Sequence, residues 1–453
     1  MSFVKIHDKD NVHINLENGH KYALCDIDEG SSVIKYGFSI GVATKDIKEG
    51  EHVHSHNLKT ALDEKAEYIY APTGEKTEKV APFTVMAYRR KNGSVGIRNE
   101  IWIVNTVGCV NGVSQKLSAL TGVLCFTHPY GCSQLGGDHE RTQKILKGLI
   151  NHPNAAGVLV LGLGCENNNI AEMKKVLGEV DEERVRFLNV QDCSDEIAEG
   201  VKIIRELQSL ADKEERSSVP VSEIVIGMKC GGSDGYSGIT ANPLCGKITD
   251  NLVSMGGSAV LTEVPEMFGA EQLLMNRCVN RNVFYKTVDL INNFKQYFIS
   301  HGQPVSENPS PGNKAGGITT LEDKSLGCVQ KGGNAPVTAV LTYGDTVSEK
   351  GLNLLEGPGN DLVACTNLAA AGCHIILFTT GRGTPLGAPV PTVKIATNTS
   401  LYENKPHWMD FDAMLGDEES LWQLIKDVCE GKETCNEKNG YREIAIFKDG
   451  VTL

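Results

Sequence analysis

A series of apolar runs without polar alternation constrains the fold of this chain more than any other feature. From residue 101 onward the runs include IWIVNTV, GVLVLGLG, EIVIG, IILF and VKIA. Continuous Val, Ile and Leu runs are typical of strands buried on both faces, as in parallel sheets covered by helices. Helices are predicted between several runs, at residues 139–150, 169–177, 194–213 and 270–282. The pattern therefore predicts an α/β fold with largely parallel sheets.

The order of these patterns predicts three domains. At 453 residues the chain is too long for one hydrophobic core, because such cores stop growing at roughly 250–300 residues. Short strand-like runs at 12–16, 22–24 and 39–43, separated by turn signals, predict a small β domain. The predicted organisation is this β domain over residues 1–70, a polar, proline-bounded linker over 71–83, and α/β domains over 84–218 and 219–453.

Composition argues against several classes of function. The net charge of −13, without a basic stripe, disfavours binding to nucleic acid or to an anionic membrane surface. The amino terminus lacks a secretory signal pattern and the 14 cysteines include no CxxC pair, so we expect a cytoplasmic protein with reduced cysteines. The expected partner is a small molecule, and a homodimer is the default assembly.

Glycine-rich segments follow two of the apolar runs, KCGGSDGYSG after IVIGM and TTGRGTP after IILF. In open α/β sheets the ligand crevice lies beyond the carboxyl ends of the strands, where such glycines can form an anion-binding nest. No GxxxxGK[ST] or GxGxxG motif indicates a nucleotide. A carboxylate ligand is predicted instead, with Arg98, Lys229 and Arg382 as cationic partners. The Gly/Pro/Asn-rich segment 301–317 is predicted to be a functional loop.

The remaining strand-end side chains carry hydroxyl, amide and carboxylate groups, which suit a small polyhydroxylated acid. They are Ser233, Asp234, Ser237, Asn242, Glu263, Glu266, Thr379, Thr380 and Asn398. Helix capping is the alternative interpretation, above all for Ser233 and Asp234.

Histidines and cysteines supply further candidates. In HVHSH, His52, His54 and His56 alternate, so on a strand all three lie on one face within reach of a metal or a substrate. His128 is the second candidate for a functional histidine. Three cysteines follow apolar runs and, gathered at one edge, can hold an iron–sulfur cluster; packed thiols are the alternative. They are Cys132, Cys165 and Cys230.

Long motifs then resemble the altronate/galactarate dehydratase family. They include GIRNEIWIVNTVGCVN, HPYGCSQ, KCGGSDGYSGITANP, EVPEMFGAE and FTTGRGTPLGAPVPTVKIATN, while DIKEGEHVHSHN resembles the family's amino-terminal β-clip (SAF-like) domain. The resemblance implies a hydro-lyase that dehydrates an aldonate or aldarate, such as altronate or galactarate, to a 2-keto-3-deoxy acid. It also implies a divalent cation, Fe²⁺, Mn²⁺ or another. A lyase that releases sulfite from sulfolactate and a non-catalytic sugar-acid sensor remain alternatives.

Dehydration needs a base for the proton next to the carboxylate and help for the departing hydroxyl. Metal binding is assigned, as a hypothesis, to His54, His56, Glu166, Cys132 and Cys230. Acid and base catalysis is assigned to His128, Lys229 and His54. Substrate binding is assigned to Arg98, Asn99, Ser233, Asp234, Asn242, Glu266, Thr380 and Arg382.

Overall fold

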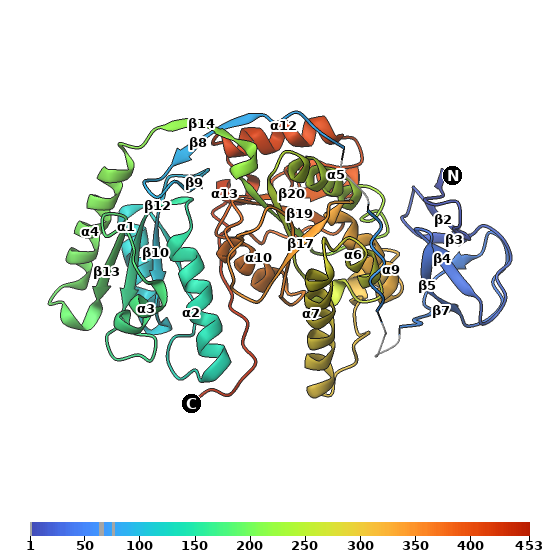
Figure 1. Ribbon diagram of the computed structural model, residues 1–453, viewed down its shortest axis with the longest axis horizontal. Helices are drawn as coiled ribbons and strands as arrows, with labels where there is room; N and C mark the ends of the chain where they lie inside the picture. The colour runs from blue at the N-terminus through green and yellow to red at the C-terminus, as the bar shows by residue number, and fades with distance from the viewer. Residues whose placement is uncertain (1, 63–67, 75–77) are drawn as a thin grey trace.

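The computed structural model describes residues 2–62, 68–74 and 78–453. Figure 1 shows three bodies in a row: a parallel sheet with its helices at the left, a larger sheet in the middle, and the small amino-terminal β structure at the right. The predicted α/β fold with an amino-terminal β domain is confirmed. No helix within the described ranges is long and apolar enough to cross a membrane.

The amino-terminal part consists of two small antiparallel sheets that share one apolar core. The first contains β1 (Phe3–Val4), β2 (Val12–Asn15), β3 (Lys21–Ala23) and β6 (His52–Val53), and the second contains β4 (Ser32–Lys35), β5 (Phe38–Ala43) and β7 (Leu58–Lys59). The strands predicted at 12–16, 22–24 and 39–43 correspond to β2, β3 and β5. Alternate residues of these strands, among them Val12, Val33 and Ile40, are buried in the core.

The segment HVHSH differs from the predicted strand. The strand β6 ends at Val53, because the Asn57 side chain donates to the His52 carbonyl (2.9 Å) and accepts from the His54 amide (2.9 Å), which closes a turn. The expectation that His52, His54 and His56 share one strand face is therefore wrong. The turn still keeps their rings together, with centroids 5.3 Å apart for His52 and His54 and 5.7 Å apart for His52 and His56.

The structure describes only part of the predicted linker 71–83 and of the end of the predicted domain 1–70. Residues 63–67 and 75–77 lie outside the described residues. Nearby, the Tyr68 hydroxyl donates to Glu271 (2.6 Å) and the Tyr70 hydroxyl donates to the Cys278 carbonyl (3.2 Å). The chain after the β structure thus lies against the carboxyl-terminal part.

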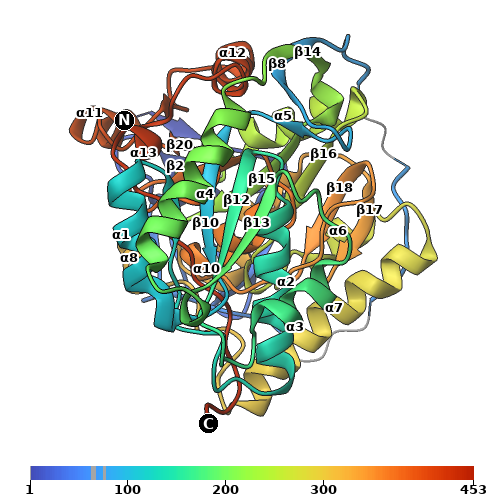
Figure 2. The same ribbon diagram turned by 90° about the vertical axis from the view of Figure 1, so that its left-hand side faces the viewer.

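The second part is built on a four-stranded parallel sheet of order β11-β10-β12-β13. Its strands are β10 (Glu100–Asn105), β11 (Leu124–Phe126), β12 (Ala155–Gly162) and β13 (Val185–Asn189). Helices α1 (Asn111–Thr121) and α4 (Glu196–Ala211) cover one face, and α2 (Gly136–Asn151) and α3 (Ile170–Leu177) cover the other (Figure 2). The helices predicted at 139–150, 169–177 and 194–213 correspond to α2, α3 and α4.

The segment predicted to separate the two α/β parts forms a strand. Strand β14 (Arg216–Pro220) pairs antiparallel with β8 (Thr84–Arg89), which also pairs with β9 (Val95–Gly96). The two ends of the second part therefore join in one small sheet, and the domain limits at 84–218 and 219–453 stay predictions.

The carboxyl-terminal part contains a seven-stranded parallel sheet of order β17-β18-β16-β15-β19-β20-β21. Its strands are β15 (Val225–Cys230), β16 (Ser258–Leu261), β17 (Val337–Leu341), β18 (Gly351–Leu355), β19 (Ile375–Thr380), β20 (Thr392–Ala396) and β21 (Phe411–Asp412). Its helices are α5 (Ala241–Ser254), α6 (Glu271–Met275), α7 (Arg281–Ser300), α8 (Pro311–Ala315), α9 (Leu321–Cys328), α10 (Asp361–Ala370), α11 (Thr399–Asn404), α12 (Glu418–Cys429) and α13 (Cys435–Lys438). The inner strands are buried throughout, as the continuous apolar runs predict.

One predicted helix is wrong in extent. Residues 270–282 do not form a single helix, because α6 ends at Met275 and α7 begins at Arg281. Between the two helices the Val279 amide donates to the Val337 carbonyl at the sheet edge (3.1 Å). The Asn280 side chain then accepts from the Val283 amide (3.0 Å) and caps α7.

Two buried histidines connect the α/β parts. His152 Nδ1 accepts from the Asn154 amide, which leaves Nε2–H to donate to the Cys373 carbonyl (3.1 Å). His374 Nδ1 accepts from the Val225 amide, and its Nε2–H donates to the Val95 carbonyl (2.7 Å). Burial lowers the pKa of His152 to about 3 and that of His374 to about 4, so both rings are neutral in the folded protein.

Stability should therefore decrease in acid. An unfolded histidine has a pKa near 6.5, so between pH 6.5 and about 4 the unfolded chain binds more protons than the folded one. We expect the free energy of unfolding to be maximal above this window and to fall by roughly 1 kcal/mol per pH unit for each histidine within it. Urea unfolding of the wild type and of His374→Gln, with exposed His407→Gln as control, measures this slope, which should be shallower only in His374→Gln.

Candidate active site

The carboxyl ends of the central strands gather on one edge of the seven-stranded sheet. Strand β15 lies between β16 and β19, parallel to both, and Cys230 at its end is the register partner of Thr379. Beyond β16 the chain turns sharply at Glu263, which has a positive φ of 69°. A non-glycine residue in this left-handed conformation is uncommon and indicates local strain, which is frequent at functional sites.

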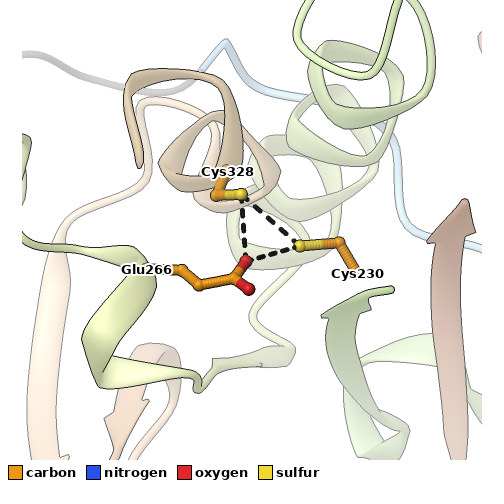
Figure 3. Close-up of side chains that lie close together, drawn as sticks. All are labelled: Cys230, Glu266 and Cys328. Carbon is orange, nitrogen blue, oxygen red and sulfur yellow. Dashed lines mark hydrogen bonds between the residues drawn. The ribbon is translucent and has the colours of Figure 1, made fainter. Parts of the chain in front are cut away.

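Two thiols and a carboxylate meet at this edge, as Figure 3 shows. The carboxylate Oε2 of Glu266 lies 3.0 Å from Cys230 Sγ and 3.1 Å from Cys328 Sγ, and the two sulfurs are 3.4 Å apart. All three side chains are buried. Among the described residues, they form the only group of three His, Cys, Asp or Glu side chains whose ligand atoms all lie within 4.8 Å of one another.

Buried lysines surround this Cys230–Glu266–Cys328 centre. Lys324 Nζ lies 2.8 Å from Glu266 Oε1, and Lys331 Nζ lies 3.8 Å from Glu263. Burial alone would raise the pKa of Glu266, but Lys324 and the other lysines hold it well below its ordinary range. The hydrogen bond from the Cys328 thiol lowers the pKa of Cys230. The same hydrogen bond, followed by burial, raises the pKa of Cys328. The centre therefore favours an anionic Cys230 sulfur and an anionic Glu266 carboxylate, the forms that bind a cation, beside a Cys328 thiol.

Lys229 is the third lysine of this group. Its three N–H donors are engaged by Glu263, by Asp361 (2.8 Å) and by the Cys230 carbonyl. Burial lowers its pKa, but Glu263 and Asp361 raise it further, so the ammonium keeps its proton at neutral pH. Lys229 thus holds Glu263 and the end of β15 in place.

The amino-terminal β structure contributes to the same site. A small cavity beside the centre is lined by side chains from both parts, namely Lys35, Tyr36, Ser233, Asp234, Ser237, Asn242, Asp323, Lys324 and Cys328. Behind it, Asp323 accepts from Lys21 (2.8 Å) and from Lys35 (2.9 Å), and all three side chains are buried. Two buried ammonium groups share this one carboxylate, and the cavity lining carries charged groups of both signs, with Lys35 and Lys324 opposite Asp234 and Asp323.

The predicted strand-end residues lie at or next to this cavity. The Asp234 carboxylate accepts from Ser237, Thr397 and Asn398, and burial raises its pKa. Asn242 donates to the Gly327 carbonyl (3.0 Å) and accepts from the Thr379 hydroxyl (2.7 Å). These contacts shape the cavity wall. Asp234 accepts from the amides of Tyr236 and Ser237 in a turn, and the N-cap of α5 is Thr240, so the helix-capping interpretation of Asp234 is wrong.

The other predicted strand-end residues are placed as follows. Ser233 is buried in the wall, and its carbonyl accepts from Asn313 (2.8 Å) in α8, within the predicted functional loop 301–317. Thr380 Oγ1 accepts from the Gly383 amide (2.9 Å). Arg382 is exposed and flanks Gly232.

Other candidates belong to the four-stranded sheet, which Figure 1 places on the far side of the seven-stranded sheet from the amino-terminal part. His128 accepts from the Tyr130 amide and donates to the Asn105 carbonyl (2.8 Å), so the backbone engages both ring nitrogens. Glu166 accepts from two amides and from Thr106 (2.7 Å). The structure does not bring these residues to the Cys230–Glu266–Cys328 centre.

The proposed cluster cysteines are likewise divided between sheets. Cys132 and Cys165 are exposed beside the four-stranded sheet, near Asn167 and Gln191 respectively, whereas Cys230 ends a strand of the seven-stranded sheet. In the described part of the chain the three thiols are not gathered at one edge, so this structure gives no support to the iron–sulfur hypothesis.

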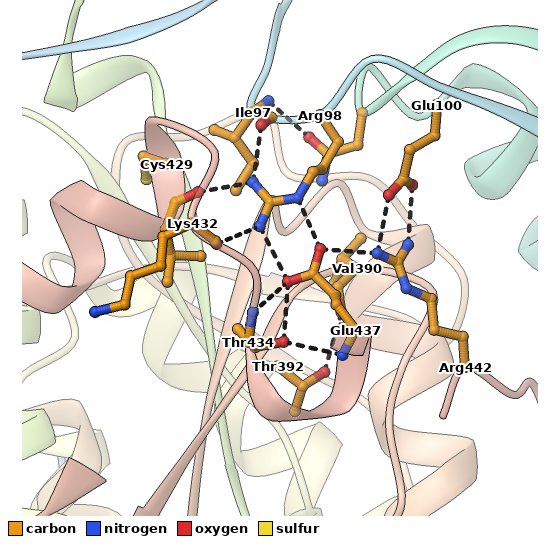
Figure 4. A network of polar contacts seen from close by, with 12 residues as sticks. Ile97, Arg98, Glu100, Val390, Thr392, Cys429, Lys432, Thr434, Glu437 and Arg442 are labelled. Carbon is orange, nitrogen blue, oxygen red and sulfur yellow. Dashed lines mark hydrogen bonds and ion pairs between the residues drawn. The ribbon is translucent and has the colours of Figure 1, made fainter. Parts of the chain in front are cut away.

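Arg98 lies in the network of Figure 4. All five of its N–H donors are engaged, by the Glu437 carboxylate (2.7 and 3.0 Å) and by the carbonyls of Ile97, Val428 and Lys432. Its neighbour Asn99 contacts Arg90 (2.7 Å) and the Ala211 carbonyl (2.8 Å). Arg98 therefore connects the second part to α13 and has no donor left for a substrate carboxylate.

Replacing Arg98 by methionine should destabilise the protein without weakening substrate binding. Removing one partner of a buried ion pair costs about 3–5 kcal/mol, because Glu437 stays buried with less compensation. Urea unfolding measures the loss, and exposed Arg205→Met is the control. A raised KM for the acid in folded Arg98→Met would show instead that Arg98 binds substrate.

Sequence reasoning missed several residues of the site. They are Lys21, Lys35, Asp323, Lys324, Cys328 and Lys331. Asp323 and Lys324 follow the predicted functional loop 301–317 but were not included in it. No local sequence pattern distinguishes a buried lysine of β3 or β4 from a lysine at the surface. Cys328 ends a helix, so it did not share the strand-end signal of Cys230.

The site is an ionisable centre at the carboxyl ends of parallel strands, next to a strained residue and covered by a second domain. This arrangement is typical of an α/β enzyme. Three family models match consecutive segments: the altronate/galactarate dehydratase SAF domain at residues 13–61, the second domain of D-galactarate dehydratase/altronate hydrolase at 87–212, and the carboxyl-terminal D-galactarate/altronate dehydratase domain at 221–452. The chain belongs to the altronate/galactarate dehydratase family.

Relatives extend over the whole chain. It is 53% identical to an altronate dehydratase of Bacillus subtilis and 50% identical to one of Escherichia coli, each with 100% of both chains covered. Identity to a galactarate dehydratase (L-threo-forming) of Escherichia coli is 32%, over 98% of this chain and 96% of the relative. Identity falls to 30% for the β subunit of a (2R)-sulfolactate sulfo-lyase of Chromohalobacter salexigens, over 81% of this chain and 97% of the relative.

Proposed function

We propose that the protein removes water from a sugar acid, with altronate as the first substrate to test, and releases a 2-keto-3-deoxy acid. The observation that carries the proposal is the buried Cys230–Glu266–Cys328 centre beside a small polar cavity lined by Lys35. The 50–53% identity to altronate dehydratases over full length supports altronate above galactarate, and water above sulfite as the leaving group.

The donor set of the centre fits a divalent cation. Two thiols and one carboxylate are suited to a borderline or soft ion such as Fe²⁺, and three protein ligands leave positions open for a substrate. Cys230, Glu266 and Cys328 would hold the ion. When bound, the ion supplies Lewis-acid stabilisation of negative charge on substrate oxygen. This assignment replaces the hypothesis that the same ion is held by His54, His56, Glu166 and Cys132.

Lys35 is proposed to hold the substrate carboxylate. Lys35 lines the cavity, and its Nζ donates to Asp323 (2.9 Å) and is also hydrogen-bonded to the Tyr36 side chain. Loss of the proton next to a carboxylate places further negative charge on that group, which a fixed ammonium stabilises. The wall residues Ser233 and Asn242 are proposed to orient the hydroxyl-bearing carbons.

Replacing Lys35 by methionine should lower kcat/KM by about 100-fold, because the substrate carboxylate loses a buried charged partner. Lys21→Met is the matched control, since Lys21 shares Asp323 but is absent from the cavity lining. Both variants lose one ion pair, so both should lose stability. Steady-state kinetics on altronate separate them, and equal activities would argue against carboxylate binding by Lys35.

Product analysis tests the proposed function. The reduced, Fe²⁺-supplemented protein is incubated with a panel of aldonates and aldarates, including altronate and galactarate, and with sulfolactate, and 2-keto acid and sulfite are measured. We expect 2-keto-3-deoxy acid from altronate and no sulfite. Sulfite release would favour the sulfo-lyase alternative, and binding without any product would favour a sensor.

The predicted homodimer is tested separately, by measuring the molecular mass of the protein in solution.

A further inference from the structure

The hairpin between β4 and β5 places two side chains at the small cavity of the candidate active site. Lys35 ends β4 and pairs with Phe38 of β5, so Tyr36 and Gly37 form a two-residue loop. Both loop residues have a positive φ, 60° for Tyr36 and 80° for Gly37, which is the pattern of a type I′ turn. Asparagine, aspartate or glycine usually stands first in such a turn. A tyrosine there is strained, and strain of this kind is frequent at functional sites.

The turn brings two consecutive side chains together. Neighbouring side chains of a strand point to opposite faces, but Lys35 Nζ lies 4.6 Å from the centroid of the Tyr36 ring and is hydrogen-bonded to its side chain. The Gly37 amide donates to the buried Asp10 carboxylate (2.8 Å), which holds the turn in place. The ammonium and the phenol thus form one fixed pair in the lining of the cavity.

The rest of the protein leaves space for the phenol end of Tyr36. A Cβ atom at Gly238 would overlap the Tyr36 oxygen, and one at Gly327 would lie 3.4 Å from it. Gly238 belongs to the loop after β15 and Gly327 to α9, and both line the cavity. The phenol oxygen therefore lies against bare backbone at the cavity, beside the helix that ends in Cys328.

The hydrogen bonding of this phenol suits a proton donor. An ammonium only donates, so the contact with Lys35 uses a lone pair of the Tyr36 oxygen and leaves the phenol hydrogen for another acceptor. Burial raises the pKa of Tyr36, so the phenol keeps its proton at neutral pH. Lys35 opposes this effect and stabilises the phenolate once the proton has left.

We propose that Tyr36 is the catalytic acid that protonates the departing hydroxyl, an inference that rests on the proposed dehydration. A base takes the proton from the carbon next to the carboxylate, and the electron pair of that C–H bond forms the carbon–carbon double bond. The C–O bond at the next carbon breaks with its electron pair on oxygen, which takes the Tyr36 proton and leaves as water. The base then releases one proton to solvent and the phenolate regains one.

A change of leaving group tests this role. Tyr36→Phe removes the phenol oxygen and keeps the ring, and its kinetics on altronate are compared with those on 3-deoxy-3-fluoroaltronate, whose fluoride leaves without a proton. We expect kcat on altronate to fall at least about 100-fold, with fluoride release within about threefold of the wild type. A purely structural role of Tyr36 would slow both substrates alike.

Tyr236→Phe is the matched control. The Tyr236 hydroxyl donates to the Leu16 carbonyl (3.1 Å), so it also joins the amino-terminal β structure to the rest of the protein, but Tyr236 is absent from the cavity lining. It should keep wild-type turnover of both substrates. If Tyr36→Phe does not fold, Gly238→Ala repeats the test, because the added methyl group displaces the phenol oxygen. It should lose turnover of altronate and retain fluoride release.

The inference is overturned if folded Tyr36→Phe dehydrates altronate as fast as the wild type, or if it slows both substrates by the same factor. The wild type reports separately on the proposed function. No turnover of altronate by the wild type would contradict the dehydration and the acid assignment together, whereas full turnover by Tyr36→Phe would contradict the acid assignment alone.

Discussion

Replacing Cys328 by serine is expected to lower the turnover of altronate by about 1,000-fold, equivalent to about 4 kcal/mol of transition-state stabilisation. A serine hydroxyl ionises far less readily than a thiol when it contacts a cation, so the variant loses one sulfur ligand of the Cys230–Glu266–Cys328 centre and keeps nearly the same shape. Bound iron should decrease in parallel. Steady-state kinetics and metal analysis of the purified protein measure both effects.

A second buried cysteine provides the control for this substitution. Cys245 is fully buried on α5 but outside the centre, and burial raises the pKa of its thiol to about 12, so it stays a packed, neutral side chain. Cys245→Ser should cost stability comparable to Cys328→Ser and leave turnover within about twofold. Unchanged iron content and turnover in folded Cys328→Ser would refute the assignment of this centre.

Replacing Asp323 by asparagine is expected to destabilise the junction between the amino-terminal β structure and the rest of the protein by about 3–5 kcal/mol. Burial alone would raise the pKa of Asp323, but Lys21 and Lys35 keep it well below its ordinary range, so the carboxylate is charged. The amide leaves two buried ammonium groups without a counter-charge. Thermal unfolding and hydrogen exchange in β3 and β4 measure the loss.

An exposed aspartate is the matched control. Asp26 forms an ion pair with Lys48 at 2.8 Å, and both side chains are largely solvated, so Asp26→Asn should leave the unfolding midpoint nearly unchanged. Because Lys35 also lines the cavity, Asp323→Asn should lose activity together with the protection of β3 and β4. Loss of activity with full protection would mean that the carboxylate acts in chemistry and not in docking.

Local sequence patterns predicted most of the helices and strands of the fold. Helices α2, α3 and α4 fall where they were predicted, because each has an apolar face of helical period between two buried strands. The prediction failed where tertiary contacts compete with periodicity. Residues 270–282 break into two helices because Val279 bonds to the sheet edge, and HVHSH leaves its strand because Asn57 closes a turn.

For the site, the sequence by itself determined the edge of the sheet and two of the three side chains of the centre. Glycine-rich segments after apolar runs mark strand ends, and parallel strands bring those ends together, so Cys230 and Glu266 were predicted to lie there. Tertiary structure alone decided that Cys328 completes the centre, that Lys21 and Lys35 enter from another domain, and that Arg98 is fully engaged elsewhere. The physical reason is that hydrophobic periodicity reports which face of an element is buried. The charge and ligand chemistry of a buried group depend on neighbours that are distant in sequence.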